Sequence, residues 1–147
     1  MDAIQEKELN ALSREVIGSC IDIHKTLGPG LLESIYLDLL CFDLGLKGIS
    51  CEKEKELHFL FKGHAFNTQL RADLIVENKL LIELKSVVEM HPIFTAQIMT
   101  YLRLTNIELG LLINFNVPLL KEGIHRIRLD NPKQLDTLAL SETSNEH

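Results

Sequence analysis

Apolar residues recur every three or four positions in three parts of the chain, which is the spacing of amphipathic helices. The first part covers residues 9–27 and ends at Gly28-Pro29-Gly30. The second covers residues 31–44, and Gly45 is placed to end it. A third helix is predicted from His91-Pro92, because proline suits the first position of a helix. Its apolar stripe consists of Phe94, Ile98, Tyr101 and Leu102.

Between the second and third helices the pattern changes to that of extended strands. Strands are predicted over residues 49–55 and 57–61, and the next extended segment runs from Ala65 toward Asp73. After the third helix, the apolar run 109–115 predicts a strand inside a sheet, and residues 124–129 predict an edge strand. Helices and strands in this order predict a layered α/β or α+β domain with a mixed sheet.

The stretch RADLIVENKLLIELK, residues 71–85, is central to this predicted fold. Apolar side chains alternate on both sides of Glu77-Asn78-Lys79, which predicts a hairpin with a tight turn at these three residues. Asp73 is then expected nearly opposite Glu83, with Lys85 on the same face of the second strand as Glu83. Strands this apolar are expected to be covered on both faces, so the three charged groups should be at least partly removed from water.

Length and composition favour a single globular domain. The chain has 147 residues, of which 46% are apolar and 24% are charged. We expect one domain over residues 1–130 and a polar tail over residues 131–147. A cytoplasmic protein is expected, because the polar N-terminus is not typical of a signal peptide and no apolar run is long enough to span a bilayer. The cysteines lack CxxC spacing and are expected to be buried reduced thiols: Cys20, Cys41 and Cys51.

The net charge of −6 argues against binding of nucleic acid over the whole surface, because phosphate contacts need a basic face. Two local groups of basic residues remain, one over residues 53–64 and one over residues 121–128. Runs of this kind are more often solvated surface than binding sites.

The carboxylates of Asp73 and Glu83 are the hard oxygen ligands that Mg²⁺ prefers, usually with several retained waters. Lys85 could orient or deprotonate a water molecule, or stabilise charge that develops on a phosphate. Gln97 lies on the apolar stripe of the third helix and could hold the attacking water or a metal ligand. The chemistry that these residues suggest is metal-assisted hydrolysis of a phosphodiester.

Each of these residues also has a structural interpretation. Asp73, Glu83 and Lys85 could form an ion pair across the hairpin, worth about 0–1 kcal/mol if exposed. Glu33 is favoured in the first turn of a helix by the helix dipole, although its carboxylate could also point inward. Gln97 could cross-link the core, Tyr101 could be a packed aromatic residue, and Arg71 could either contact phosphate or pair with Glu77.

Several motifs together resemble a known family. Asp73 followed by Glu83-Leu84-Lys85 spells D…ExK, and with the order helix, three strands, helix, strand it resembles the PD-(D/E)XK nuclease superfamily. Residues 97–101 resemble the QxxxY element of the RecB-like branch. Residues 30–36 spell GxxExxY, and the chain from about residue 16 to 129 is similar to the small stand-alone GxxExxY proteins. One departure is Arg71-Ala72, where a proline often precedes the acid.

The resemblance implies a restriction-endonuclease-like αβββαβ core, in which helices flank a central mixed sheet, with an extra N-terminal helix. It implies that Asp73 and Glu83 are metal ligands, with the Leu84 carbonyl as a possible third, and that Lys85 is catalytic. Glu33 would be the acid that the first core helix adds to the metal site. Gln97 and Tyr101 would form the accessory element, and Arg71 is a further accessory candidate.

The implied function is a nuclease that uses Mg²⁺ or Mn²⁺ to hydrolyse phosphodiester bonds, with DNA as the leading substrate. The alternative is a catalytically silent module that keeps the fold and binds nucleic acid or protein. No membrane association is expected. A homodimer and a protein partner that delivers the substrate are both compatible with the sequence.

Overall fold

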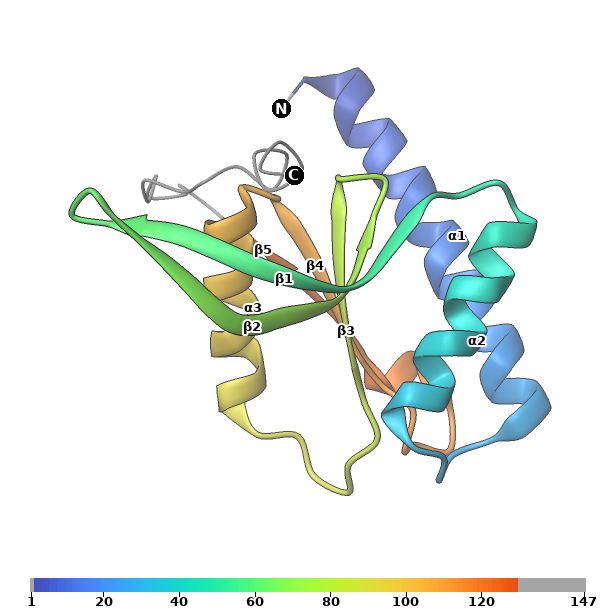
Figure 1. Cartoon of the computed structure of the whole chain (residues 1–147). Helices are drawn as coiled ribbons and strands as arrows, with labels where there is room; N and C mark the ends of the chain where they lie inside the picture. Colours follow the sequence, from blue (N-terminus) through green and yellow to red (C-terminus); the bar gives the residue numbers. More distant parts are fainter. Residues whose placement is uncertain (1, 130–147) are drawn as a thin grey trace.

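A five-stranded mixed sheet forms the middle of the protein in the computed structural model, which describes residues 2–129. Helices α1 (Ala3–Leu27) and α2 (Glu33–Leu46) cover one face of the sheet, and α3 (Pro92–Thr105) covers the other (Figure 1). The predicted fold class is therefore confirmed. The polar tail predicted for residues 131–147 lies outside the described residues.

The strands follow one another across the sheet in the order β1-β2-β3-β4-β5. Their bounds are Cys51–Phe61 for β1, His64–Val76 for β2, Leu80–Lys85 for β3, Leu109–Asn114 for β4 and Ile124–Arg128 for β5, and the short 3-10 helix η1 (Leu120–Gly123) precedes β5. Only the β3–β4 pair is parallel among these five strands. Its two strands are joined through α3, as a parallel pair requires a long crossover.

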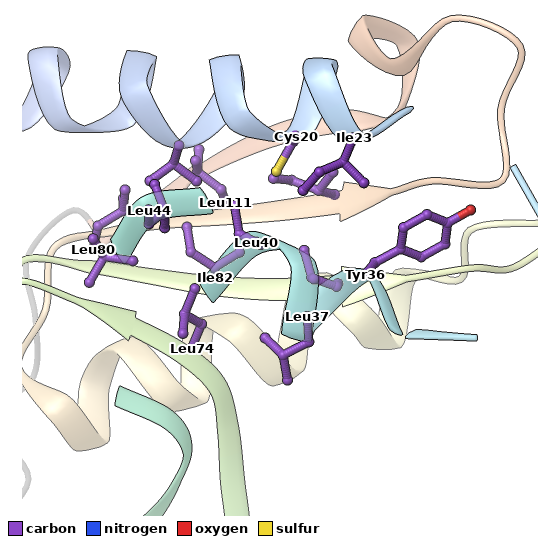
Figure 2. Packing of buried hydrophobic residues seen from close by; sticks show 14 of the residues in the cluster. Cys20, Ile23, Tyr36, Leu37, Leu40, Leu44, Leu74, Leu80, Ile82 and Leu111 are labelled. Carbon is purple, nitrogen blue, oxygen red and sulfur yellow. The ribbon is translucent and has the colours of Figure 1, made fainter. Parts of the chain in front are cut away.

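The larger part of the core lies between the sheet and the two N-terminal helices (Figure 2). Every second residue of β3 points to this side, where it meets the apolar stripes of α1 and α2. The side chains that share this layer include Val16, Cys20, Tyr36, Leu40, Leu44, Leu74, Leu80, Ile82 and Leu111. The helical stripes predicted over residues 9–27 and 31–44 are buried only in part, because Leu27, Leu32 and Ile35 are exposed.

A second apolar cluster lies between the sheet and α3. It is formed by the other face of the strands together with the buried face of the helix, and includes Ile75, Leu81, Ile98, Leu102, Leu112 and Ile127. Strand β3 is therefore buried on both faces, which explains its nearly continuous apolar sequence. The side chains of β3 that share the α3 face with Leu81 are Glu83 and Lys85.

Three details differ from the sequence-based predictions. Helix α1 begins at Ala3, six residues before the predicted start, where Asp2 caps it. Gly45 does not end the second helix, because α2 continues to Leu46 and the left-handed residue that follows is Gly48, with φ of 73°. The two strands predicted over residues 49–61 form one strand, β1, whose register against β2 shifts between Glu56 and His58.

The prediction of buried thiols is confirmed only for Cys20, and the prediction of an edge strand over residues 124–129 is confirmed. The three cysteines are free thiols, with Cys20 buried and Cys41 and Cys51 half-buried. β5 lies at an edge of the sheet. Within residues 2–129, no helix combines the length and the apolar character that a bilayer crossing needs.

Candidate active site

The hairpin of β2 and β3 has the predicted register. Leu74 pairs with Ile82 and Val76 pairs with Leu80, so continuing the antiparallel ladder by one residue places Asp73 opposite Glu83. The turn contains two consecutive left-handed residues, Glu77 and Asn78, with φ of 52° and 55°. Two positive φ values are typical of the tight turns that match the twist of a hairpin.

The two carboxylates are held by the main chain of the opposite strand. Oε1 of Glu83 accepts a hydrogen bond from the amide of Asp73 at 3.1 Å, and Oδ2 of Asp73 accepts one from the amide of Leu84 at 2.9 Å. These side-chain bonds continue the hairpin beyond the last backbone pair. Both acidic groups are therefore positioned by strands rather than by flexible loops.

Burial and the neighbouring negative charge make Glu83 an unusual carboxyl group. Its side chain is 7% exposed. Burial first, and the charge of Asp73 second, raise the pKa of Glu83 to about 9, while the charge of Lys85 acts in the opposite direction. The predicted removal from water is confirmed for Glu83. Within residues 2–129, no ion pair joins Lys85 to either carboxylate, so the structural ion-pair interpretation is not supported.

Lys85 contacts an aromatic ring of α3 that the sequence patterns did not predict. Its Nζ lies 4.5 Å from the centre of the Phe94 ring. A cation over a ring face is attracted by the ring quadrupole, which restricts where the ammonium group can lie. Positions 85 and 94 belong to different elements and share no periodic relation, so only the packing of α3 on the sheet could reveal this contact.

Glu33 lies beside the C-terminal end of β3. Its Oε2 accepts a hydrogen bond from the amide of Ser86 at 3.3 Å. Glu33 and Ser86 line an open pocket of about 330 Å³ together with Leu31, Leu32 and Ser34. The carboxylate therefore points toward the sheet, and the first turn of α2 is tied to the residue that follows Lys85.

Tyr36 shows why the GxxExxY pattern places Glu33 in this position. The Tyr36 hydroxyl donates to the carbonyl of Gly28 at 2.6 Å and accepts from the amide of Leu31 at 3.2 Å. Its ring stacks on Phe115, with the ring centres 4.1 Å apart. The tyrosine therefore holds the loop before α2 against the core, and the helix that follows carries Glu33 to the end of β3.

Tyr101 and Gln97, the two candidate site residues on α3, differ in burial. Tyr101 is half-buried, and burial followed by the charges of Glu83 and Asp73 raises the pKa of its phenol. Gln97 was predicted on the buried stripe, but this prediction is wrong because its side chain is exposed. Residues 91–97 are all exposed or half-buried, and burial begins at Ile98, so the first half of α3 lies at the rim of the sheet.

Arg71 is exposed on β2, where it pairs in register with Glu56. The alternative pairing with Glu77 does not occur among the described residues, and the Glu77 carboxylate instead accepts a hydrogen bond from the amide of Ser50. Arg71 precedes Asp73 by two residues on the same strand. The structure therefore leaves its guanidinium available beside the hairpin.

Asn114 was missed by the sequence analysis. It is buried at the end of β4, in register with Lys85. Its side chain accepts from the amide of Val87, at 3.1 Å, and donates to the carbonyl of the same residue, at 3.0 Å. The segment after β3 is therefore fixed to β4. The sequence did contain a signal for this role, since Asn114 is a polar residue in the apolar run GLLINF. A buried amide side chain needs hydrogen-bond partners.

The chemistry of the site fits a divalent cation. The carboxyl groups of half-buried Asp73 and buried Glu83 face each other, and a bound cation would offset the repulsion that, together with burial, favours protonated Glu83. Over residues 2–129 there is no group of three or more His, Cys, Asp or Glu side chains arranged to hold a metal ion. The structure therefore does not gather Glu33 with Asp73 and Glu83 into one such group.

The fold and the site define an α+β domain in which two adjacent strands, β2 and β3, present an acidic pair and a lysine. A family model of the PD-(D/E)XK nuclease superfamily matches residues 10–127, and the chain belongs to this superfamily. The arrangement of five strands and flanking helices is consistent with its restriction-endonuclease-like fold. Searches of curated proteins and of solved structures found no match.

Proposed function

We propose that the protein is a metal-dependent nuclease that hydrolyses phosphodiester bonds in DNA. The observation that carries the proposal is the pairing of half-buried Asp73 with buried Glu83, which backbone amides of the two strands hold in place. Burial first, and the charge of Asp73 second, raise the pKa of Glu83 to about 9. A cation between the two carboxylates would be favoured, because its charge offsets their repulsion. Membership of a nuclease superfamily supports the same conclusion.

Asp73 and Glu83 would hold Mg²⁺ or Mn²⁺, with the Leu84 carbonyl as a further oxygen. Two carboxylates are enough, because Mg²⁺ usually keeps several waters. When bound, the cation would act as a Lewis acid and lower the pKa of a coordinated water. Glu33, at the end of β3, would orient a water beside the site.

Lys85 would stabilise the negative charge that develops on the phosphate or orient the attacking water. The aromatic ring of Phe94 would keep its ammonium group on the side of β3 that carries Glu83. Arg71 would contact the phosphate backbone beside the hairpin, and exposed Gln97 and half-buried Tyr101 would contact the substrate from α3. The net charge of −6 limits such contacts to this region of the surface.

We also assign the chain to the GxxExxY proteins and to the QxxxY branch within the superfamily. The support for the first assignment is that the glutamate and the tyrosine of the motif have distinct tasks, since Tyr36 fixes the loop and Glu33 binds Ser86. The support for the second is that Gln97 and Tyr101 lie on the helix that packs beside the acidic pair. A cytoplasmic location completes the proposal.

The proposal is tested by incubating the protein with single-stranded DNA, duplex DNA and RNA, with Mg²⁺, with Mn²⁺ and with EDTA. Cleavage should require the metal and should fall by about 10²–10⁴-fold in Lys85→Ala, the range expected for loss of an acid–base group. Lys7→Ala is the matched control, because Lys7 is exposed on α1, far along the chain from the site. Equal cleavage by Lys85→Ala and the parent chain would reject the proposal.

A catalytically silent module is the second candidate. It is favoured by the exposure of Gln97 and by the lack of a three-ligand group within residues 2–129. This candidate predicts binding of nucleic acid or of a protein without cleavage under any metal condition. Metal-dependent protection from thermal unfolding that disappears in Glu83→Gln, together with cleavage that Glu83→Ala abolishes, would reject it. A nuclease that needs a protein partner would cleave only after that partner is added.

A further inference from the structure

Helix α2 carries a second apolar stripe, of which only the central residue, Leu39, packs against the core. The stripe follows the spacing three, four, three, four and consists of Leu32, Ile35, Leu39, Phe42 and Leu46, where Leu32 immediately precedes the helix. Leu39 is half-buried, whereas Leu32, Phe42 and Leu46 are 70%, 67% and 70% exposed. We call these five residues the outer stripe.

The outer stripe is separate from the buried face of the same helix. Because each residue advances an α-helix by about 100°, the five positions fall within an arc of roughly 80°. The buried residues of α2 are Tyr36, Leu37, Leu40 and Leu44, and their arc is centred roughly 130° away round the helix. A helix that is apolar on both sides is typical of a helix that packs on both sides. Figure 1 shows α2 at the periphery of the domain, beside α1.

The spacing of the outer stripe is that of the a and d positions of a heptad. Residues at these positions fit between the side chains of another helix, which is how two helices pack at a shallow angle. The partner that this stripe fits is therefore a helix with apolar residues at the same spacing. A single pair of free helices this short would be unstable, but here the fold already holds α2 in its helical form.

A second copy of the outer stripe meets this requirement. If two α2 helices pack antiparallel about a twofold axis at Leu39, then Leu32 lies against Leu46 of the other copy and Ile35 lies against Phe42. The smaller β-branched residue thus faces the large aromatic ring in both halves of the contact. A twofold contact needs such a self-complementary surface.

The charged residues at the rim of the outer stripe are compatible with the same arrangement. Asp38, next to Leu39, forms an ion pair with Lys53 at 2.7 Å, and Asp43 lies 3.9 Å from Lys47. Each acidic group is therefore accompanied by a lysine of its own chain. At the twofold axis, two Asp38–Lys53 pairs would meet with charges of alternating sign, which removes the repulsion expected between two acidic rims.

From these observations we infer that the protein forms a homodimer through the outer stripe of α2, with the two helices antiparallel. This inference concerns the outer side of α2, where Leu32 is the one stripe residue that lines the pocket of Glu33 and Ser86. It does not depend on the proposed nuclease activity. The apolar side chains at the centre of the contact would supply its stability, because they leave water when the helices meet.

The first experiment measures the mass of the full chain by analytical ultracentrifugation over a range of concentrations. The expected mass is twice 16.7 kDa. Phe42→Glu and Leu46→Glu should each shift the protein to the monomer while its circular dichroism is retained. Phe61→Glu is the matched control, because Phe61 is also an exposed aromatic residue, at 52%, but lies at the end of β1. This variant should remain dimeric.

A parent chain that stays monomeric up to roughly 0.1 mM, where even a weak specific contact is populated, would overturn the inference. So would a dimer that Phe61→Glu disrupts and Phe42→Glu does not. If removal of residues 130–147 turned a monomer into a dimer, the tail rather than a second copy would be the occupant of the outer stripe. Each of these outcomes is read from the same mass measurement.

A second experiment tests the antiparallel orientation by disulfide cross-linking under mild oxidation. Leu39→Cys should cross-link with itself, because residue 39 lies on the twofold axis. Leu32→Cys and Leu46→Cys should form few dimers separately but should cross-link when mixed, and the parent chain controls for Cys41 and Cys51. Cross-linking of Leu32→Cys with itself, and not with Leu46→Cys, would contradict the antiparallel arrangement.

Discussion

The amide of Asp73 donates a hydrogen bond to the carboxylate of Glu83 at 3.1 Å, although the two side chains carry charges of the same sign when both are ionised. The amide of Leu84 in turn donates to the carboxylate of Asp73 at 2.9 Å. The hairpin therefore holds two acidic groups in a position that electrostatic repulsion disfavours. The stability of the protein should therefore depend on the protonation of Glu83.

Without divalent cations, the stability of the protein should fall as the pH rises between about 4.5 and 9. The pKa of Glu83 is raised from its ordinary value of 4.5 to about 9. Over this interval the folded state keeps a proton that the unfolded state has lost, so a rising pH favours unfolding. Because one pKa unit corresponds to about 1.4 kcal/mol, the contribution of Glu83 should exceed that amount over the interval.

Glu83→Gln should flatten this part of the pH profile, since an amide does not titrate. The measurement is the free energy of unfolding by urea in EDTA at several pH values, for the parent chain and the variant. Glu89→Gln is the matched control, because Glu89 is exposed after β3. Parallel profiles for the parent chain and Glu83→Gln would show that Glu83 titrates normally.

Replacement of Phe94 should slow cleavage by changing where the Lys85 ammonium group lies. A cation–π contact is worth about 0.5–2 kcal/mol, which corresponds to a decrease in kcat of roughly 2–30-fold for Phe94→Leu. Phe94→Tyr keeps the ring and should retain most of the activity. The measurement is steady-state cleavage, in which kcat should fall more than KM rises.

Ile93→Ala serves as the control for Phe94, because Ile93 is its exposed neighbour in the first turn of α3. This variant should cleave at the parent rate. If Phe94→Tyr lost as much activity as Phe94→Leu, the aromatic ring would not be the feature that positions Lys85.

Tyr36→Phe should destabilise the protein by about 1–3 kcal/mol, because it leaves the half-buried carbonyl of Gly28 and the amide of Leu31 without the tyrosine hydroxyl. The ring stacking on Phe115 is kept in this variant. Urea denaturation gives the change in free energy. Hydrogen exchange should show faster exchange at Leu31, and unchanged exchange there would contradict the assigned contact.

Two glycine positions should respond in opposite directions to alanine. A Cβ at Gly123 would lie 2.1 Å from the backbone oxygen of Asn114, which is too close for any side chain, so Gly123→Ala should cost several kcal/mol. A Cβ at Gly45 meets no atom within 4 Å and lies inside α2, so Gly45→Ala should stabilise by about 0.5–1 kcal/mol. Thermal unfolding of the two variants checks both signs, and equal melting temperatures would refute the comparison.

Local sequence patterns predicted the elements that contain the acidic pair. The register of β2 and β3 could be predicted because period-two alternation and the turn at Glu77-Asn78 together allow only one pairing of the apolar faces. The start of α3 was predicted for a similar reason, since Pro92 suits the first helical position. The roles of Asp73, Glu83 and Lys85 in catalysis remain predictions.

The sequence patterns gave wrong predictions where the outcome depends on how one helix or strand packs against another. Helical periodicity placed Gln97 on a buried stripe, but it could not show that the first half of α3 lies at the rim of the sheet. The end of α2 was misplaced at Gly45 because glycine is only a weak helix breaker when the following turn continues the helix. Two predicted strands formed the single strand β1, because the register shift near Leu57 lets both runs pair with the long strand β2.

The sequence by itself determined the order of helices and strands and the facing of Asp73 and Glu83, because short-range periodicity and turn chemistry act within a few residues. The tertiary structure alone decided that Lys85 lies over Phe94 and that Glu33 reaches the amide of Ser86. It also decided that, among residues 2–129, Leu32, Phe42 and Leu46 of the outer stripe are exposed. These properties depend on contacts between segments far apart in the sequence, and no local pattern contains them.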